Sequence, residues 1–253
     1  MDIQQPIDIE IDTSLCIIMK EVGSDAAGPF HNYTKLYSTI FEPVRSTPLR
    51  ILEVGLAPNP DISDSVPAAA VRGWRRYFPN ATVIGADPSA EYVVPVEGVS
   101  TYAYNWTDGS GILSIFDHED TREPFDVIIY DGPGNPADKA VHFAVFTEHV
   151  REGGIIILED IDWKESVFWM SIKQNWDKAF PHFTWRPISI PCRTHRGDNI
   201  LMIAKVGNKA EAAKAAAPAP VAPATPAAPA TPATPAANGA PVTNKVIGEL
   251  PTS

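Results

Sequence analysis

Acidic side chains close several apolar runs of this sequence, and they are the residues best placed to do chemistry. The five acids are Glu53, Asp87, Asp131, Glu159 and Asp160, and they fall at the ends of four such runs. If the runs are strands of a parallel sheet, their carboxyl ends meet at one edge, where ligands of such sheets bind. Each acid taken alone is more often a helix cap or a turn residue. Their joint placement predicts a ligand site lined by carboxylates.

The first of these turns reads Glu53-Val54-Gly55, and a glycine there lets the backbone approach a ligand closely. No second and third glycine follow, so the phosphate-cradling GxGxxG pattern is absent, which counts against NAD or FAD. A carboxylate beside the turn would repel a pyrophosphate and suits a ligand that carries an amine and a sulfonium charge. Asp87 is placed to accept hydrogen bonds from both ribose hydroxyls of a nucleoside.

The elements that must position these acids follow from the apolar pattern. Strands are predicted over residues 49–55, 81–87, 99–105, 125–132, 154–160, 182–190 and 199–206. Helices are predicted over residues 12–22, 31–44, 68–78, 135–152 and 164–180, with Asn135 as a cap, Pro136 in the first turn and Gly153 after the end of the fourth helix. Strands separated by helices predict an α/β fold: a Rossmann-like, doubly wound, mostly parallel seven-stranded sheet.

Three regions are expected along the chain of 253 residues. Residues 1–48 form a helical N-terminal extension, and residues 49–207 form the Rossmann-like domain. Residues 208–253 are rich in alanine and proline, and frequent prolines interrupt any helix there. This segment has too little apolar surface to offset the entropy lost on ordering. A disordered C-terminal tail is therefore predicted.

Composition excludes some classes of partner. The formal net charge of −11 disfavours nucleic acid, which rewards a basic surface. Cys16 and Cys192 form neither a metal-binding spacing nor a disulfide framework. No apolar run approaches the roughly 18 residues of a membrane span, and the opening residues are acidic, unlike a signal peptide. A cytoplasmic protein without a membrane partner is therefore expected.

Six segments, in order, carry a resemblance to a known family. They are Gly23-Ser24-Asp25 with HNYTKLY, PLRILEVGL, VRGWRRYFPNATVIGAD, FDVIIYDGPG, GGIIILEDI and GDNILMIAK. Together, over about residues 23–205, they resemble class I S-adenosylmethionine-dependent methyltransferases. The branch they resemble includes macrolide-sugar O-methyltransferases and cephalosporin-hydroxylase-like proteins. The resemblance implies S-adenosylmethionine as cofactor.

The resemblance also implies roles for single residues. Glu53 and Gly55 would lie against the methionine part of the cofactor, and Asp87 would bind its ribose. Asn105 and Trp106 would flank the adenine after the third strand.

A second group of residues would face the acceptor. The resemblance implies that Asp131, Glu159 and Asp160 do so and, in metal-dependent members, hold Mg²⁺, which prefers oxygen ligands. A hydroxyl bound to the metal would have a lowered pKa and become a nucleophile. The alternative is that Glu159 and Asp160 cap the next helix, near Trp163, and bind nothing.

Two departures from the family pattern fall where chemistry is expected. Tyr130 stands where the family has the first aspartate of a pair, and Gly134 stands where it has a histidine, the expected general base. His31, from the entry motif, would lie near the mouth of the cofactor site. The catalytic candidates are therefore Asp131, His31 and Tyr130, where Tyr130 would donate to the substrate or fill the space of a metal.

Methyl transfer to oxygen on a sugar or another small molecule is the function that these features predict. The alternative is a catalytically inactive cofactor-binding or interaction module with the same fold, which the changes at Tyr130 and Gly134 permit. Mg²⁺ dependence and oligomeric state stay open.

Overall fold

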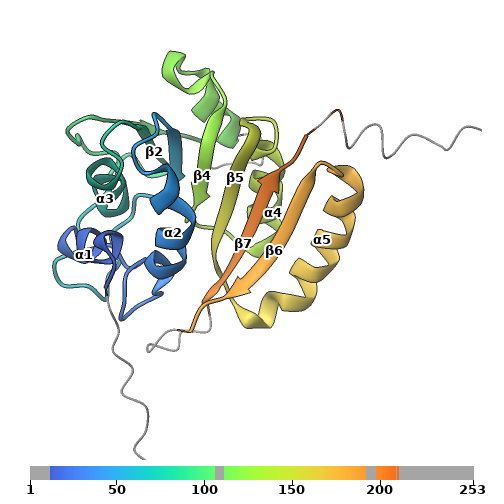
Figure 1. Cartoon of the computed structure of the whole chain (residues 1–253), viewed down its shortest axis with the longest axis horizontal. Coiled ribbons are helices and arrows are strands. Elements are labelled where there is room, and N and C mark those ends of the chain that lie inside the picture. The colour runs from blue at the N-terminus through green and yellow to red at the C-terminus, as the bar shows by residue number, and fades with distance from the viewer. Residues whose placement is uncertain (1–11, 106–110, 192–197, 209, 211–253) are drawn as a thin grey trace, which may run out of the picture. The chain divides into compact units, whose positions relative to one another are not determined.

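A computed structural model describes residues 12–105, 111–191, 198–208 and 210 (Figure 1). This part of the chain forms one seven-stranded sheet with the strand order β3-β2-β1-β4-β5-β7-β6. The strands are β1 (Arg50–Val54), β2 (Thr82–Asp87), β3 (Val99–Ala103), β4 (Phe125–Tyr130), β5 (Val150–Ile161), β6 (Phe183–Ser189) and β7 (Ile200–Val206).

The sheet is parallel except at one strand. β1 pairs in parallel with β2 and β4, β2 with β3, and β4 with β5, whereas β7 runs antiparallel to both β5 and β6. The predicted Rossmann-like, mostly parallel seven-stranded sheet is therefore confirmed. The strand order reverses between β1 and β4, and at such a switch point doubly wound sheets open a crevice for ligands.

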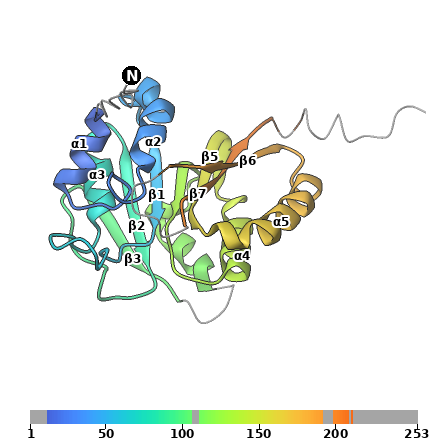
Figure 2. The same cartoon turned by 90° about the horizontal axis from the view of Figure 1, so that it is seen from below.

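Helices cover both faces of the sheet (Figures 1 and 2). They are α1 (Ser14–Glu21), α2 (Tyr33–Phe41), α3 (Ala69–Tyr77), α4 (Pro136–Phe146) and α5 (Ser166–Ala179). Short 3₁₀ helices are η1 (Glu42–Val44), η2 (Gly111–Asp117), η3 (Glu119–Thr121) and η4 (Trp163–Glu165). One apolar core joins α1, α2 and α3 to the sheet, and a second core on the opposite face joins α4 and α5 to it.

The strand period of two decides which core each residue enters. In β4, Val127 and Ile129 pack with α1–α3, whereas Ile128 and Tyr130 pack on the α4–α5 face. The N-terminal helices belong to the first of these cores: Leu15 of α1 and Tyr37 of α2 are fully buried in it.

Helix α4 begins as predicted and ends earlier. The Asn135 side chain accepts hydrogen bonds from the backbone N–H groups of residues 137 and 138, so the predicted cap is confirmed. The predicted extension of this helix to residue 152 is wrong, since α4 ends at Phe146 and β5 begins at Val150. Val150 pairs with Phe125 of β4, and a register shift follows before the regular ladder. Pairing with β4 therefore overrides the helical pattern of residues 150–152.

Most of the predicted disordered tail lies outside the described residues. Among the residues that the structure does describe, no helix combines the length and the apolar character that crossing a bilayer requires.

Candidate functional site

Three carboxylates converge at the carboxyl ends of β4 and β5. Asp131 follows β4, Glu159 and Asp160 lie near the end of β5, and one oxygen of each lies within 4.8 Å of the other two. Burial, followed by repulsion between neighbouring acids, raises the pKa of Asp131 and of Glu159 well above the usual range. Burial also raises the pKa of Asp160, to about 6. Such a cluster is relieved by a proton or by a cation placed between its members.

Helix α2 supplies two hydroxyl donors to this cluster. Tyr33 donates to Oδ1 of Asp160 at 2.8 Å, and Tyr37 donates to Oε1 of Glu159. The two tyrosines are four residues apart and so share one face of the helix. Their spacing predicts a helix, but nothing in the sequence identifies the partners of their hydroxyls. The available signal was that a buried tyrosine hydroxyl needs an acceptor.

An irregular backbone at Asp160 turns its side chain toward α2. In a regular strand Glu159 and Asp160 would point to opposite faces of the sheet. Asp160 instead has a φ of +55°, in the left-handed region that residues other than glycine rarely adopt, and the ladder with β7 shifts register between Leu158 and Ile161. Both carboxylates therefore face the same helix. Left-handed residues of this kind are concentrated at functional sites.

The alternative in which Glu159 and Asp160 cap the next helix is wrong. Asp162 caps η4 instead, by accepting a hydrogen bond from the backbone N–H of Lys164. Glu159 and Asp160 instead accept hydrogen bonds from the hydroxyls of Tyr37 and Tyr33 in α2.

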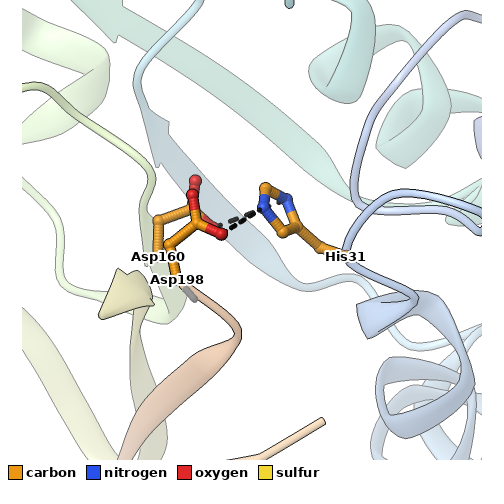
Figure 3. Close-up of side chains that lie close together, drawn as sticks. All are labelled: His31, Asp160 and Asp198. Atoms are coloured by element: carbon orange, nitrogen blue, oxygen red, sulfur yellow. Dashed lines mark ion pairs between the residues drawn. The ribbon is translucent and has the colours of Figure 1, made fainter. Parts of the chain in front are cut away.

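His31 lies beside the carboxylates and faces two aspartates, Asp160 and Asp198 (Figure 3). Its Nδ1 is 3.5 Å from Oδ1 of Asp160, and its Nε2 is 3.4 Å from Oδ1 of Asp198. The imidazole is 5% exposed and stacks on Tyr33 with 4.9 Å between ring centroids. Asp198 was not predicted as a site residue, although its segment, GDNILMIAK, contributed to the family resemblance.

Glu53 lies at the end of β1 with an unsatisfied oxygen. The residue is 3% exposed, and its Oε2 has no hydrogen-bond partner among the described residues. Burial raises the pKa of Glu53 to about 8. Glu53, Gly55 and Asp131 all line a small cavity of about 20 Å³. A buried carboxylate that faces a cavity with one unsatisfied oxygen fits a cationic ligand group.

Gly55 is required by the protein backbone itself. Its φ is +113°, and a Cβ there would lie 2.2 Å from the carbonyl oxygen of Asp131. The sequence interpretation reserved this space for a ligand, but the end of β4 occupies it. A side chain at position 55 would therefore disturb the packing of β1 against β4.

Asp87 closes β2 and braces the neighbouring loop. Its two carboxylate oxygens each accept a backbone hydrogen bond of 2.7 Å, from Leu56 and from Ser89. Burial raises the pKa of Asp87, while these amides lower it. The predicted adenine neighbours are Asn105, which is exposed just after β3, and Trp106, which lies outside the described residues. Ribose and adenine contacts stay predictions.

Tyr130 lies apart from the carboxylates, on the α4 face of the sheet. Its ring is fully buried, and its hydroxyl donates to the carbonyl oxygen of Pro133 at 2.9 Å and lies 2.7 Å from Nδ1 of His142. The idea that Tyr130 fills the space of a metal is therefore wrong, because strand alternation sends its side chain away from Asp131.

Comparisons with known proteins support the resemblance. No protein-family model matches the chain. The chain is 30% identical over 141 residues to the 8-demethyl-8-(2-methoxy-alpha-L-rhamnosyl)-tetracenomycin-C 3'-O-methyltransferase of Streptomyces olivaceus, which covers 55% of this chain and 34% of that protein. It is 31% identical over 137 residues to the L-olivosyl-oleandolide 3-O-methyltransferase of Streptomyces antibioticus, covering 54% and 34%.

Solved structures share the fold. The MycE methyltransferase from the mycinamycin biosynthetic pathway, in complex with Mg and SAH, superimposes with a TM-score of 0.59 at 19% identity and covers 78% of this chain and 56% of that one. The O-methyltransferase from Bacillus cereus, in complex with SAH, gives a TM-score of 0.52 at 14% identity, with 79% and 93% covered. The resemblance to class I S-adenosylmethionine-dependent methyltransferases is confirmed.

The methyltransferase-like chain spans about a third of the length of the curated relatives that it matches. The structure places the residues at which this chain differs from the family pattern. Gly134, with a φ of +128°, leaves no side chain where the family has a histidine. His31 is an imidazole that the structure does place beside the carboxylates.

Proposed function

We propose that the chain binds S-adenosylmethionine and transfers its methyl group to a hydroxyl oxygen of a sugar or another small molecule. The observation that carries the proposal is the convergence of Asp131, Glu159 and Asp160 within 4.8 Å at the carboxyl edge of the sheet. The relatives that share sequence with this chain are named as O-methyltransferases of tetracenomycin and oleandolide glycosides.

The cofactor half of the proposal rests on the switch point beside β1. Glu53 offers an unsatisfied buried carboxylate oxygen at the cavity that Gly55 and Asp131 also line. In its ionised form this carboxylate favours the amine and sulfonium charges of S-adenosylmethionine over a phosphate. Asp87, at the end of the adjacent strand, is proposed to accept hydrogen bonds from the ribose hydroxyls. Its oxygens keep free lone pairs beside the hydrogen bonds that they accept from Leu56 and Ser89. When bound, the cofactor supplies an electrophilic methyl group.

The acceptor half rests on the carboxylate cluster. Asp131, Glu159 and Asp160 are proposed to hold Mg²⁺, because converging buried carboxylates are hard oxygen ligands that need a compensating cation. Such an ion, when bound, supplies positive charge that favours the ionised form of a nearby hydroxyl. Tyr33 and Tyr37 orient Asp160 and Glu159 through hydrogen bonds from their hydroxyls.

The proton of the acceptor hydroxyl must go to a group of this chain or to water. His31, whose Nδ1 lies 3.5 Å from Asp160, and Asp131, in the same cluster of carboxylates, are the proposed recipients. The acceptor itself is proposed to be a small molecule. Nucleic acid stays disfavoured by the net charge of −11, and the cytoplasm stays the proposed location.

Calorimetry tests this proposal. S-adenosylmethionine and its demethylated product are titrated into the full chain with and without Mg²⁺, and both are expected to bind. Glu159→Gln is expected to remove the effect of Mg²⁺ on the binding of these compounds. Glu119→Gln, which changes an exposed acid in η3, is the matched control and should keep that effect. The cofactor assignment fails if neither compound binds the wild-type chain.

A second candidate is a module that binds the cofactor without turning it over. The observation that favours it is Gly134, which removes the general base expected from the family resemblance. Release of the demethylated product in the presence of a panel of glycosides separates the two candidates. Tight binding with no release across the panel would favour the inactive module.

A further inference from the structure

His31 brings an imidazole to two carboxylates that come from different parts of the chain. Asp160 lies near the end of β5 and Asp198 lies two residues before β7, and both carboxylates face the same edge of the His31 ring (Figure 3). One ligand atom from each of these three residues lies within 4.8 Å of the other two.

The polar atoms of this group are buried and incompletely satisfied. Within the described part of the chain, Nε2 of His31 and Oδ1 of Asp198 have no hydrogen-bond partner. They lie 3.4 Å apart, longer than the roughly 2.7–2.9 Å of a hydrogen bond between charged groups. Two ligands of one metal ion, each about 2.1 Å from it, lie about 3.0–3.4 Å apart. The spacing therefore suits an ion between the two atoms better than a proton.

We propose that His31, Asp160 and Asp198 form a second divalent-cation site, which shares Asp160 with the site of Asp131 and Glu159. The shared carboxylate has two oxygens and can bridge two ions, as carboxylates do in two-metal centres. The proposal concerns metal binding by the ligand-free chain and does not require methyl transfer.

The ligand types indicate which ion this site takes. Mg²⁺ prefers oxygen ligands and water, whereas imidazole suits first-row transition metals. One imidazole nitrogen with two carboxylate oxygens therefore favours an ion such as Mn²⁺, Fe²⁺ or Zn²⁺. The remaining positions would be taken by water, since the chain offers three ligands.

Tyr33 holds the ligands in place from outside the site. Its ring stacks on His31, and its hydroxyl donates to Oδ1 of Asp160 and, at 2.9 Å, to the carbonyl oxygen of Asp198. Asp25 also lies near the imidazole, with an oxygen 3.9 Å from Nδ1. An imidazole that binds a metal through one nitrogen commonly faces a carboxylate with the other, and these neighbours provide that arrangement.

A protonated His31 that pairs with both aspartates is the competing interpretation. It predicts the same distances but no metal–nitrogen bond. Detection of that bond therefore decides between the two.

The test uses Mn²⁺ as the probe and the full chain without cofactor. Electron paramagnetic resonance counts the bound ions, and electron spin-echo modulation detects an imidazole nitrogen bonded to Mn²⁺. Two ions per chain are expected, one of them coupled to nitrogen. His31→Gln should abolish the nitrogen coupling. It should also lower the affinity for one of the two Mn²⁺ ions by more than the roughly 10- to 100-fold that loss of an outer-shell partner causes. Asp198→Asn should weaken the same ion.

Two further variants keep the outcome unambiguous. Glu159→Gln removes a ligand of the other site and should leave the nitrogen-coupled ion in place. His118→Gln changes an imidazole that stacks on Tyr102 and should alter nothing. The second site is disproved if wild-type chain shows no nitrogen coupling, or if His31→Gln and Asp198→Asn leave the number and affinity of bound ions unchanged. Neither result bears on cofactor binding.

Discussion

The hydroxyl of Tyr33 is hydrogen-bonded to Oδ1 of Asp160 at 2.8 Å, although 127 residues separate them along the chain. The bond joins the second helix to the end of the fifth strand, so the N-terminal extension helps to build the candidate site. With the Tyr37 bond to Glu159, it makes α2 a support for two adjacent carboxylates.

We expect Tyr37→Phe to destabilise the fold and to weaken the proposed metal site. Without the hydroxyl, Glu159 stays buried and loses its donor, which typically costs about 1–3 kcal/mol. Loss of an outer-shell partner should also lower Mg²⁺ affinity by about 10- to 100-fold. Urea unfolding and calorimetry measure the two effects. Tyr92→Phe, in the loop after β2, is the control, and equal effects of both variants would contradict the role of α2.

Stability should fall as the pH rises from about 4.5 to 8. Burial raises the pKa of Glu53 from 4.5 to about 8, so across this range the folded chain holds a proton that the unfolded chain has lost. Each such proton contributes a slope of about −1.4 kcal/mol per pH unit to the free energy of unfolding. Unfolding of the ligand-free chain at several pH values measures it. Glu53→Gln should flatten the slope, and an unchanged slope would show that Glu53 is ionised throughout.

Gly55→Ala should destabilise the chain far more than Gly153→Ala. Both glycines have positive φ, of +113° and +82°, so both variants meet the left-handed penalty of about 1–2 kcal/mol. Only at Gly55 would the new Cβ also meet a carbonyl oxygen, at 2.2 Å from Asp131, while no described atom lies within 4 Å at Gly153. Chemical denaturation compares the two. Similar losses in both variants would contradict the close approach of β1 and β4.

Tyr130→Phe should affect stability and leave cofactor affinity unchanged. The variant removes the donor to Pro133 and the bond to His142, which should cost about 1–3 kcal/mol. Because the side chain lies on the α4 face, binding of the demethylated cofactor should match the wild type in calorimetry. A large loss of affinity would mean that the ligand site reaches this face.

The strands could be predicted to within a few residues because each is a short apolar run between turn residues. The main error, the start of β5, arose at Val150–Gly153, where polar residues follow a helical pattern and only pairing with β4 reveals a strand. Five acids could be placed at one edge because parallel strands end together. The alternation of side chains within β4 could also have separated Tyr130 from Asp131.

The partners of those acids could not be predicted from sequence. Tyr33, Tyr37 and Asp198 reach the carboxylates only because α2 and the start of β7 pack near the end of β5. Nothing local in the sequence specifies such distant contacts. The orientation of the Asp160 side chain depends on the left-handed backbone of Asp160 itself. The sequence has no glycine at this position that would indicate such a conformation.

The reversed direction of β7 has a consequence for which residues can meet. A strand that runs against its neighbours delivers its amino-terminal flank to the rim where the others deliver their carboxyl-terminal flanks, and this is how Asp198 comes to face His31. Were β7 parallel to β5, its seven residues, at about 3.3 Å each, would carry Asp198 roughly 23 Å away to the opposite rim. The direction of a single strand thus determines which side chains meet at the rim where the parallel strands end.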